Sequence, residues 1–381
     1  MGCVYHQDCG GCENRELSLS EYQKYKERQI WTFLEKNLGD LSKVWQKPVF
    51  LPDGSRRRAA FAFESKNRKL CLGFNENRSN RIVDVSRCLM LTDKINTSLA
   101  PIKSFLQELC SVVVSKKVKG KKIEHKSILS GDLLVLEAEN GLDFVLETSE
   151  DLELDHRMCI SDFMSQSTDF IRFSWRKKHA YEAEPVYQEA KPFIKIGKTD
   201  VFVAPGDFLQ PSSQGEKTLT ELVLKYVGQT RGKMADLFCG IGTFSYALAE
   251  LENTNIASFD VSKSLLKGFQ ASINAQMIQN IKIYEKNLFL YPLTADELKE
   301  FDVIVFDPPR AGAAAQVKEI CQISNDGKNR KIIAVSCNPE TFARDAKLLI
   351  SAGFELKSIT AVDQFVYSSH SEIVALFTNE K

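Results

Sequence analysis

The strongest constraint on this chain is the alternation of apolar strands and helices that begins near Gly206. The predicted strands span residues 233–238, 256–259, 281–284, 301–306 and 331–335, followed by two final strands over 355–362 and 372–377. The predicted helices span residues 244–250, 261–276, 316–323 and 340–352. Alternation at this spacing indicates an α/β fold built on a doubly wound, mostly parallel sheet. Ligands of such sheets bind beyond the carboxyl ends of the strands, so the residues that follow each strand are the candidates for function.

Cys337 follows the strand over 331–335, in the sequence Val335-Ser-Cys-Asn-Pro339. Pro339 can open the next helix, which places the thiol at a strand-to-helix turn. A lone cysteine is more often a small buried hydrophobe than a nucleophile. Two further loops at the same edge favour function, because they would bring a nucleotide loop and a carboxylate to one cleft. A nucleophilic Cys337 needs thiolate character, so an electropositive or helix-N-terminal setting is expected.

The first of these loops is glycine-rich and follows the strand over 233–238. It runs Phe238-Cys-Gly240-Ile-Gly242-Thr243, and its glycines let the backbone approach a ligand closely. Asp260 ends the next strand, where a carboxylate can accept from ribose hydroxyls. A Gly-x-Gly sequence alone is weak evidence for a nucleoside-type cofactor.

The second loop, Asp307-Pro-Pro-Arg310, follows the fourth strand, and its prolines hold the Asp307 carboxylate at the cleft. Glu372 opens the last strand after a polar tail and could act as a general base. The alternative is a solvated glutamate at a strand start.

The N-terminal half has a different pattern. Hairpin signals, with Asn140-Gly141 the clearest, predict a largely antiparallel sheet with a few helices over residues 48–204. A helix is expected over residues 16–38.

Three cysteines lie close together at the N-terminus, in the spacing Cys3-x5-Cys9-Gly-Gly-Cys12. Such spacing lets thiolates converge on one inorganic centre, which needs a fourth ligand from elsewhere in the chain. We expect Cys88 to supply it; Cys71 is the rival, but it alternates within a predicted strand. Spacing alone leaves zinc and an iron–sulfur cluster equally open.

Composition limits the partners. Lys and Arg together number 50 and so do Asp and Glu, so any RNA binding must come from local patches. Three basic runs are candidates, although each could equally be a solvated face: residues 56–58, 116–126 and 172–178. No apolar run has the length of a membrane span and no secretory signal is evident, so we expect a cytoplasmic protein with no membrane partner.

Several motifs together resemble the RNA uracil-C5 (5-methyluridine) methyltransferases that use S-adenosylmethionine. They are Asp236-Leu-Phe-Cys-Gly-Ile-Gly-Thr-Phe244, Phe306-Asp-Pro-Pro-Arg-Ala-Gly312, Val335-Ser-Cys-Asn-Pro-Glu-Thr-Phe-Ala-Arg-Asp345 and Asp363-x-Phe…His370-x-Glu372. The N-terminal cysteines resemble the branch of this family that carries a [4Fe–4S] cluster. The chain begins at the cysteines, without room for an N-terminal TRAM barrel. In this arrangement it is similar to the 23S rRNA (uracil-747-C5) methyltransferase.

The resemblance implies a role for each matching residue. Cys337 would be the nucleophile and Glu372 the base. The residues that would contact S-adenosylmethionine or position the uracil are Gln210, Phe238, Gly240, Gly242, Thr243, Asp260 and Asp307. Cys3, Cys9, Cys12 and Cys88 would ligate the [4Fe–4S] cluster. The chain departs from the family where Gln210-Pro-Ser212 replaces a common Gln-x-Asn, and where Val366-Tyr-Ser368 replaces Pro-x-Thr.

The expected organisation has two parts. Residues 1–204 would form the iron–sulfur and RNA-recognition region, with a helix over 16–38 that could pack on the catalytic domain. Residues 205–381 would form a Rossmann-like S-adenosylmethionine-dependent methyltransferase domain. The expected partner of this monomer is 23S rRNA, with the T-loop of tRNA as the alternative. Two further alternatives are a non-catalytic iron–sulfur RNA-binding protein and an adenine-N6 methyltransferase, which would not need Cys337.

Overall fold

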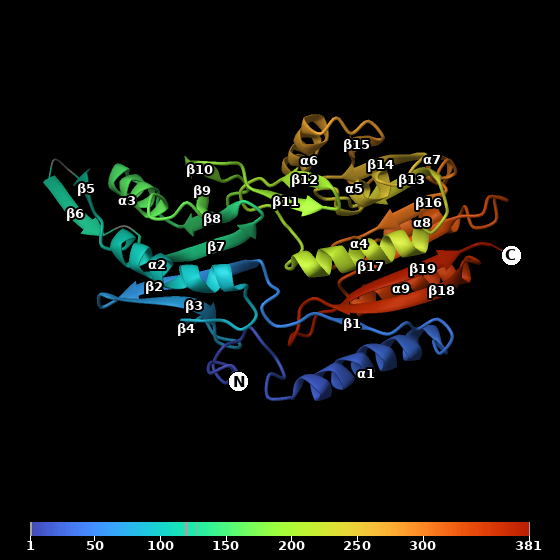
Figure 1. Ribbon diagram of the computed structural model, residues 1–381, viewed down its shortest axis with the longest axis horizontal. Coiled ribbons are helices and arrows are strands. Elements are labelled where there is room, and N and C mark those ends of the chain that lie inside the picture. The colour runs from blue at the N-terminus through green and yellow to red at the C-terminus, as the bar shows by residue number, and fades with distance from the viewer. Residues whose placement is uncertain (1, 119–120, 127, 381) are drawn as a thin grey trace. The chain divides into compact units, whose positions relative to one another are not determined.

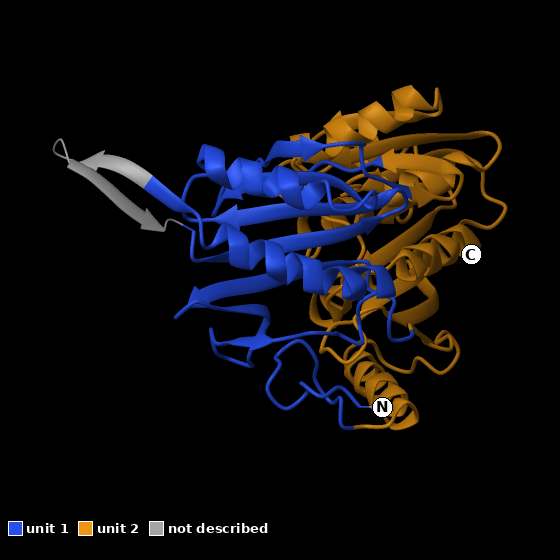
Figure 2. Cartoon of the chain, turned by 60° about the vertical axis from the view of Figure 1, so that its left-hand side comes forward, with its two compact units in different colours: residues 1–16, 52–194, 202–207 blue, residues 17–51, 195–201, 208–381 orange. Residues whose placement is uncertain are grey.

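The computed structural model describes residues 2–118, 121–126 and 128–380, and the side chains of these residues outside 115–126. The chain divides into two compact units (Figure 2). Unit 1 comprises residues 1–16, 52–194 and 202–207, and unit 2 comprises residues 17–51, 195–201 and 208–381. The sequence predicted a single break after residue 204. The difference arises mainly because residues 17–51 contribute a helix and a short strand to unit 2.

Unit 2 is built on an eight-stranded sheet with the order β1-β18-β19-β17-β16-β13-β14-β15. Its strands are β1 (Val49–Phe50), β13 (Gly232–Leu237), β14 (Thr254–Asp260), β15 (Ile281–Glu285), β16 (Val303–Phe306), β17 (Lys331–Ser336), β18 (Glu355–Asp363) and β19 (Glu372–Thr378). Strands β13 to β17 are parallel to one another, and β19 runs antiparallel between β17 and β18. The chain moves outward from β13 in one direction to β15 and in the other to β17. The doubly wound sheet predicted from the sequence is therefore present, with its switch point between β13 and β16.

Helices cover both faces of this sheet. They are α1 (Leu19–Leu38), α4 (Ser213–Val227), α5 (Thr243–Ala249), α6 (Lys263–Ala275), α7 (Ala295–Leu298), α8 (Ala314–Cys321) and α9 (Pro339–Ser351). Figure 1 shows α4 and α9 on opposite faces of strands β17 to β19, and both helices contact these strands. Ile30 and Leu34 of α1 are buried in the same core as Leu349 of α9. The first helix of the chain is thus part of unit 2.

Local sequence explains where these helices begin and end. Ser18 and Glu21 form a reciprocal capping box at the start of α1, and Gly39 follows its last residue. The Ser212 hydroxyl accepts from the Gly215 amide and caps α4. Ser212 stands where the family pattern commonly has an asparagine. In this chain the residue at that position serves as a helix cap.

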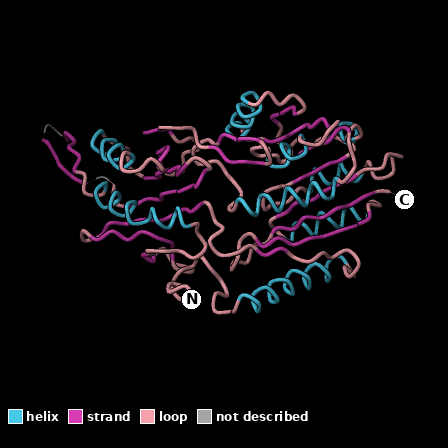
Figure 3. Tube along the Cα trace, viewed as in Figure 1, coloured by secondary structure: helices cyan, strands magenta, loops and turns pink. Residues whose placement is uncertain are grey.

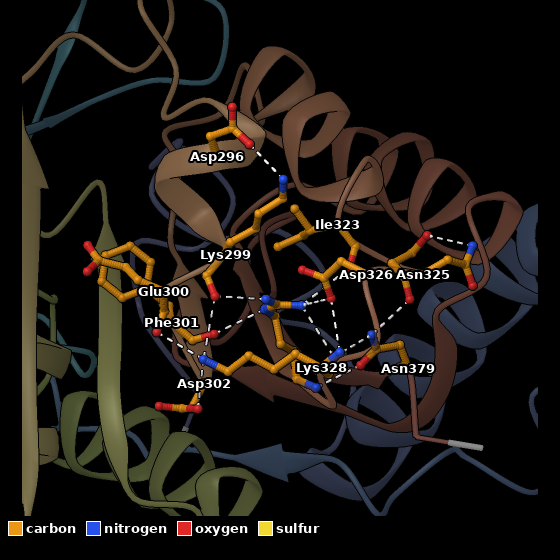
Figure 4. Close-up of polar contacts among 12 residues, drawn as sticks. Asp296, Lys299, Glu300, Phe301, Asp302, Ile323, Asn325, Asp326, Lys328 and Asn379 are labelled. Atoms are coloured by element: carbon orange, nitrogen blue, oxygen red, sulfur yellow. Dashed lines mark hydrogen bonds and ion pairs between the residues drawn. The ribbon is translucent and has the colours of Figure 1, made fainter.

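Arg330 directly precedes β17 and stabilises the edge of the sheet at which this strand begins. Its side chain is 1% exposed and donates to the carbonyl oxygens of Lys299 and Phe301 at 2.8 and 3.1 Å. It also forms a 2.5 Å ion pair with Asp326 (Figure 4). A buried guanidinium with its donors paired joins the loop before β16 to the loop before β17 at this edge.

Unit 1 contains a seven-stranded sheet with the order β10-β9-β8-β7-β2-β3-β4, antiparallel except for the pair β8 and β9. Its strands are β2 (Arg58–Lys66), β3 (Lys69–Asn75), β4 (Ile82–Asp84), β7 (Ser130–Ala138), β8 (Gly141–Thr148), β9 (Phe170–Lys177) and β10 (Glu184–Gln188). Helices α2 (Asp93–Leu109) and α3 (Leu154–Met164) pack on it through a phenylalanine-rich core. Figure 3 shows this strand-rich pattern, which agrees with the antiparallel sheet predicted from the hairpin signals.

Two further strand pairs complete the fold. Strands β5 (Val113–Val118) and β6 (Lys121–Lys126) form one two-stranded sheet, and β11 (Phe193–Ile196) and β12 (Thr199–Phe202) form another. The turn at Asn140-Gly141 joins β7 and β8 as predicted, with Gly141 at a φ of 145°. Among the helices that the structure describes, none has the length and apolar content needed to cross a bilayer.

Candidate active site

The loops that follow strands β13 to β17 line one cavity of about 470 Å³ in unit 2. A cavity of this size and mixed lining is typical of small-molecule and cofactor sites. Six of the predicted cofactor and base-binding residues line it: Gln210, Phe238, Gly240, Thr243, Asp260 and Asp307. Cys337 and Glu372 line the same cavity. The residues predicted from separate strand ends are therefore brought together.

Cys337 lies at the turn between β17 and α9. The side-chain oxygen of Asn338 accepts from the Glu340 amide at 3.0 Å and caps the helix, and Pro339 occupies its first turn. Strand register explains why Glu372 is close. Ser336 of β17 pairs with Ile373 of the antiparallel β19, so the next residues beyond this pair are Cys337 and Glu372.

Glu372 is a buried carboxylate, only 4% exposed. The Gln364 amide donates to Glu372 Oε1 at 2.9 Å and to Gln210 Oε1 at 2.8 Å. Burial raises the pKa of Glu372 to about 7, against the opposing effect of the Gln364 hydrogen bond. The alternative of a solvated glutamate is wrong, because this side chain lies inside the cavity wall.

The Cys337 thiol has a pKa raised to about 11, first by burial and then by the Glu372 and Asp307 carboxylates. The Arg310 guanidinium lowers the pKa of this thiol but does not outweigh the other effects. Of the two settings expected as alternatives, the helix N-terminus is present. The charges beside the thiol are those of Glu372, Asp307 and Arg310. Two carboxylates share the site with the thiol, so the resting sulfur is protonated at neutral pH.

Asp307 follows β16, and its backbone amide donates to the Leu237 carbonyl of β13 at 3.2 Å. Burial and the nearby Glu372 raise the pKa of Asp307 well above its usual range. Further along the same loop, Arg310 Nη2 lies 2.8 Å from His370 Nε2. The guanidinium donates in this pair, which fixes the orientation of both side chains beside the thiol.

The glycine-rich loop is held in an unusual backbone conformation. Phe238 has a φ of 63°, which is uncommon for a residue with a large side chain, and its ring packs on Phe289 at a centroid distance of 5.2 Å. Gly240 has a φ of 55°, and its amide donates to Asp260 Oδ2 at 2.9 Å. Asp260 also accepts from the Ser262 amide at 2.8 Å, so this carboxylate organises the loop that it lines.

Gly242 was predicted to contact the cofactor, but it is not among the residues that line the cavity. It lies at the start of α5 with a φ of 91°, and a Cβ there would come within 2.3 Å of the Phe269 ring. Close packing against Phe269 therefore explains this glycine better than contact with a ligand.

Several cavity residues were not predicted from the sequence. Lys286 and Phe289 follow β15, and Phe365 lies in the tail before β19. The loop of Lys286 and Phe289 carries no motif in the sequence, whereas Phe365 belongs to the Asp363-x-Phe motif but was given no role. Only their position after a parallel strand or beside His370 could have indicated them.

Helix α1 holds the tail that carries Glu372. The Tyr22 hydroxyl donates to Asp363 Oδ2 at 2.8 Å and accepts from the Tyr367 amide at the same distance. The Lys26 ammonium, 1% exposed, donates to the carbonyl oxygens of Ser368 and His370. These contacts join residues more than 340 positions apart in the chain.

Unit 1 contains a separate cavity of about 170 Å³ that is lined by Cys3, Cys9, Cys12 and Cys88. Cys71, the rival fourth ligand, does not line it. Burial raises the pKa of Cys9, Cys12 and Cys88, and neighbouring thiols of the same set add to each shift. Across the described part of the chain, however, no three His, Cys, Asp or Glu side chains converge closely enough to hold a metal ion. The thiols share a cavity without forming a finished ligand set.

Fewer side chains of the basic runs are available to bind phosphate than the sequence suggested. Arg172 is 4% exposed and forms a bidentate pair with Asp143 at 2.7–2.8 Å, and Arg176 pairs with Glu147. Arg57 is also buried. Arg172 and Arg176 are therefore structural, which corrects the prediction that the run over 172–178 is a phosphate-binding face as a whole. The lysine side chains of the run over 116–126 lie outside the residues whose side chains the structure describes.

Comparison with known proteins agrees with this geometry. Residues 26–380 match the family model described as tRNA (uracil-5-)-methyltransferase. An uncharacterised RNA methyltransferase of Brucella melitensis biotype 1 is 32% identical over 378 residues, which cover 99% of this chain and 83% of the relative. The 23S rRNA (uracil(1939)-C(5))-methyltransferase of Erwinia tasmaniensis is 27% identical over 390 residues, covering 99% and 82%.

A solved structure has the same fold over nearly the full length. It is the Pyrococcus abyssi tRNA (uracil-54, C5)-methyltransferase in complex with S-adenosyl-L-homocysteine, with a TM-score of 0.74 and 22% identity. The likeness covers 97% of this chain and 86% of that one. Because the family model matches most of its length, this chain belongs to the tRNA (uracil-5-)-methyltransferase family and is an RNA uracil-C5 methyltransferase.

Proposed function

We propose that this protein methylates C5 of a specific uridine in 23S rRNA through a covalent adduct between Cys337 and C6 of the base. The observation that carries the proposal is the register of β17 and β19, which brings Cys337 and Glu372 to the wall of one cavity. Asp307 and Arg310 line the same wall and supply polar groups for the base. A nucleophile, a base and groups for a developing enolate are what this reaction needs.

The cavity fits S-adenosylmethionine as the methyl donor. Phe238 and Phe289 offer apolar faces for an adenine ring, and Asp260 offers a carboxylate for ribose hydroxyls. S-adenosylmethionine supplies an electrophilic methyl group when bound. The solved relative of Pyrococcus abyssi holds the product of that donor, S-adenosyl-L-homocysteine, which supports the same choice here.

Covalent catalysis follows from the electronics of uracil. C5 of uracil is a poor nucleophile until a thiolate adds to C6 and turns C5 into an enolate carbon. C5 would then take the methyl group of S-adenosylmethionine as the bond between that group and the sulfonium sulfur breaks, which leaves S-adenosyl-L-homocysteine. Glu372 would take the C5 proton, and the Cys337 thiolate would be eliminated from C6. Burial and Glu372 raise the pKa of Asp307, and in its protonated form Asp307 can donate a hydrogen bond to a uracil carbonyl as negative charge develops there.

Glu372 is suited to remove the C5 proton. A pKa of about 7 lets this carboxylate be ionised and still accept a proton near neutral pH, where general bases are most effective. Gln364 orients it through the 2.9 Å hydrogen bond, and Gln364 is in turn fixed on Gln210. The base is therefore held by residues from the loop after β18 and from the loop before α4.

We further propose that Cys3, Cys9, Cys12 and Cys88 hold a [4Fe–4S] cluster. Four thiols around one cavity of about 170 Å³ are a donor set that fits such a cluster, and zinc is the competing occupant. Arg56 and Arg87 line the cavity and would offset the negative charge of the thiolates. The cluster would fix the N-terminal segment to β4 and the start of α2.

The target RNA is tested in cells that lack this protein. The named relative from Erwinia tasmaniensis supports 23S rRNA, whereas the description of the family model supports tRNA as the second candidate. 5-Methyluridine should be mapped in 23S rRNA and in tRNA from wild-type cells, from deleted cells and from deleted cells that carry Cys337→Ala. Loss of one 23S rRNA site, not restored by Cys337→Ala, is expected. Loss only from the tRNA T-loop would overturn the rRNA assignment.

A further inference from the structure

A second cavity lies beside Cys337 in unit 2, with a volume of about 370 Å³. It shares Arg310, Cys337 and His370 with the cofactor cavity. Its other walls come from α1, from the start of α9 and from the tail over residues 369–371. The thiol therefore lies where two cavities meet, and the mechanism proposed above uses only the first of them.

One wall of this second cavity carries a buried hydroxyl with no partner. Ser371 is 1% exposed, and among the described residues its Oγ has no hydrogen-bond partner. Most buried polar side-chain atoms are hydrogen-bonded, and an unpaired one costs free energy. Ser371 immediately precedes Glu372 and is one of the residues that line the cavity, so this unpaired hydroxyl belongs to the cavity wall.

The remaining walls combine an apolar surface with a cation. Ile30 and the half-buried Phe33 ring of α1 give one apolar side. The exposed Arg310 guanidinium, oriented by His370 at 2.8 Å, faces the same space. Glu340 is the single carboxylate among the lining residues. An aromatic face for stacking, a hydroxyl and a guanidinium are the groups that bind a nucleotide base and its phosphate.

We propose that this second cavity receives a nucleotide of the substrate RNA that adjoins the target uridine. The inference rests on the proposed function, because the uridine that reaches Cys337 in the first cavity must carry its neighbours in the chain with it. The base of one neighbour stacks on Phe33, its phosphate contacts Arg310, and a polar atom of the nucleotide bonds to Ser371. The cavity would thereby add sequence or shape discrimination at a position next to the modified base.

The cavity is preorganised for such a ligand. Lys26 of α1 donates to the carbonyl oxygens of Ser368 and His370, on either side of Ser369. The Ser368 hydroxyl donates to the Phe365 carbonyl at 2.6 Å. The tail is thus held before RNA arrives, which limits the entropy lost on binding.

The test uses the full-length protein and an RNA fragment that contains the mapped uridine, with either flanking nucleotide replaced by an abasic one. Ser371→Ala should raise KM for the intact RNA about two- to tenfold, the range expected for one hydrogen bond. The same variant should keep or raise its melting temperature, because no bond is lost in the free protein. Ser351→Ala, an exposed serine at the end of α9, is the matched control and should change neither value.

Phe33→Leu keeps apolar packing but removes the flat ring. It should raise KM for the intact RNA by roughly five- to a hundredfold, the range for loss of base stacking. One abasic position should weaken the wild-type enzyme by a similar factor and have little further effect on Phe33→Leu. Additive losses at both flanking positions, or an unchanged KM in Ser371→Ala and Phe33→Leu, would overturn the subsite. If wild-type enzyme methylates no uridine at all, the proposed function has failed instead.

Discussion

Glu372→Gln should make the protein more stable while removing its activity. The folded state raises the pKa of Glu372 from 4.5 to about 7, because burial disfavours the ionised carboxylate. Below pH 4.5 the residue is protonated in both the folded and the unfolded state, and its carboxyl group does not lower the stability. As the pH rises from 4.5 to about 7, the unfolded state releases this proton while the folded state keeps it, and stability is lost.

The size of the effect follows from the shift. A difference of about 2.5 pKa units corresponds to roughly 3 kcal/mol at about 1.4 kcal/mol per unit. Glutamine keeps the acceptor for the Gln364 amide, so that 2.9 Å hydrogen bond can persist. Its additional amide N–H must find a partner in a buried site, which costs about 1 kcal/mol or more. The net gain at pH 8 should therefore be about 1–3 kcal/mol, and near zero or negative at pH 4.5.

Denaturant unfolding of wild type and Glu372→Gln at pH 4.5, 6 and 8 measures this difference in the free energy of unfolding. Glu340→Gln, at an exposed position at the start of α9, is the control and should not be more stable than wild type at pH 8. A Glu372→Gln variant that is less stable than wild type at pH 8, or equally shifted at all three pH values, would refute the reasoning. Glu372 would then not be a carboxylate held at a raised pKa in the folded state.

Four further substitutions test other parts of the structure. Lys26→Met should lower the free energy of unfolding by roughly 3–5 kcal/mol, because two carbonyl oxygens of the tail lose a buried charged donor, and Lys26→Arg should restore part of it. Cys88→Ser should lose most of the iron and the brown absorbance of anaerobically purified protein, whereas Cys71→Ser should keep both; stoichiometric zinc in the wild type would contradict the cluster. Arg172→Met should destabilise unit 1 by roughly 3–5 kcal/mol through the unpaired Asp143 carboxylate. Lys178→Glu at an exposed position should change stability by less than about 0.5 kcal/mol, and a weaker salt dependence of RNA binding would identify it as a phosphate contact.

The residues at strand ends could be predicted because an α/β pattern has a fixed rule for where ligands bind. Cys337, Asp307 and Asp260 each follow a strand with a strong apolar signal, so their common edge follows from the alternation of strands and helices. Gly242 shows the limit of this reasoning. Its φ of 91° serves the packing of Phe269, and a glycine needed for packing has the same sequence signal as one needed for a ligand.

Helix α4 was missed although its signals are present. Ser212 caps it, Gly228 follows its last residue, and Leu219, Val223 and Tyr226 recur at helical spacing on its buried face. The preceding Gln210-Pro-Ser212 reads as a loop, which concealed the start of the helix. A check for caps at every serine before an apolar run would have found it.

Long-range pairing could not be predicted from one sequence. Tyr22 and Asp363 are 341 positions apart, and nothing local indicates that the first helix holds the last loop. The same limit explains the basic run over 172–178. Alternate side chains of a strand point to opposite faces, and the run gave no sign that Asp143 and Glu147 on the neighbouring strand pair with its arginines.

The central claim is that Cys337 forms a covalent bond with the target base. RNA that carries 5-fluorouridine at the mapped site should be incubated with the enzyme and S-adenosylmethionine, then analysed on a denaturing gel and by peptide mass spectrometry. Fluorine cannot leave C5 as a proton does, so a stable protein–RNA adduct is expected, attached to the peptide that contains Cys337 and absent in Cys337→Ala. An adduct on the Cys239 peptide, or methylation of uridine by Cys337→Ala, would contradict the account.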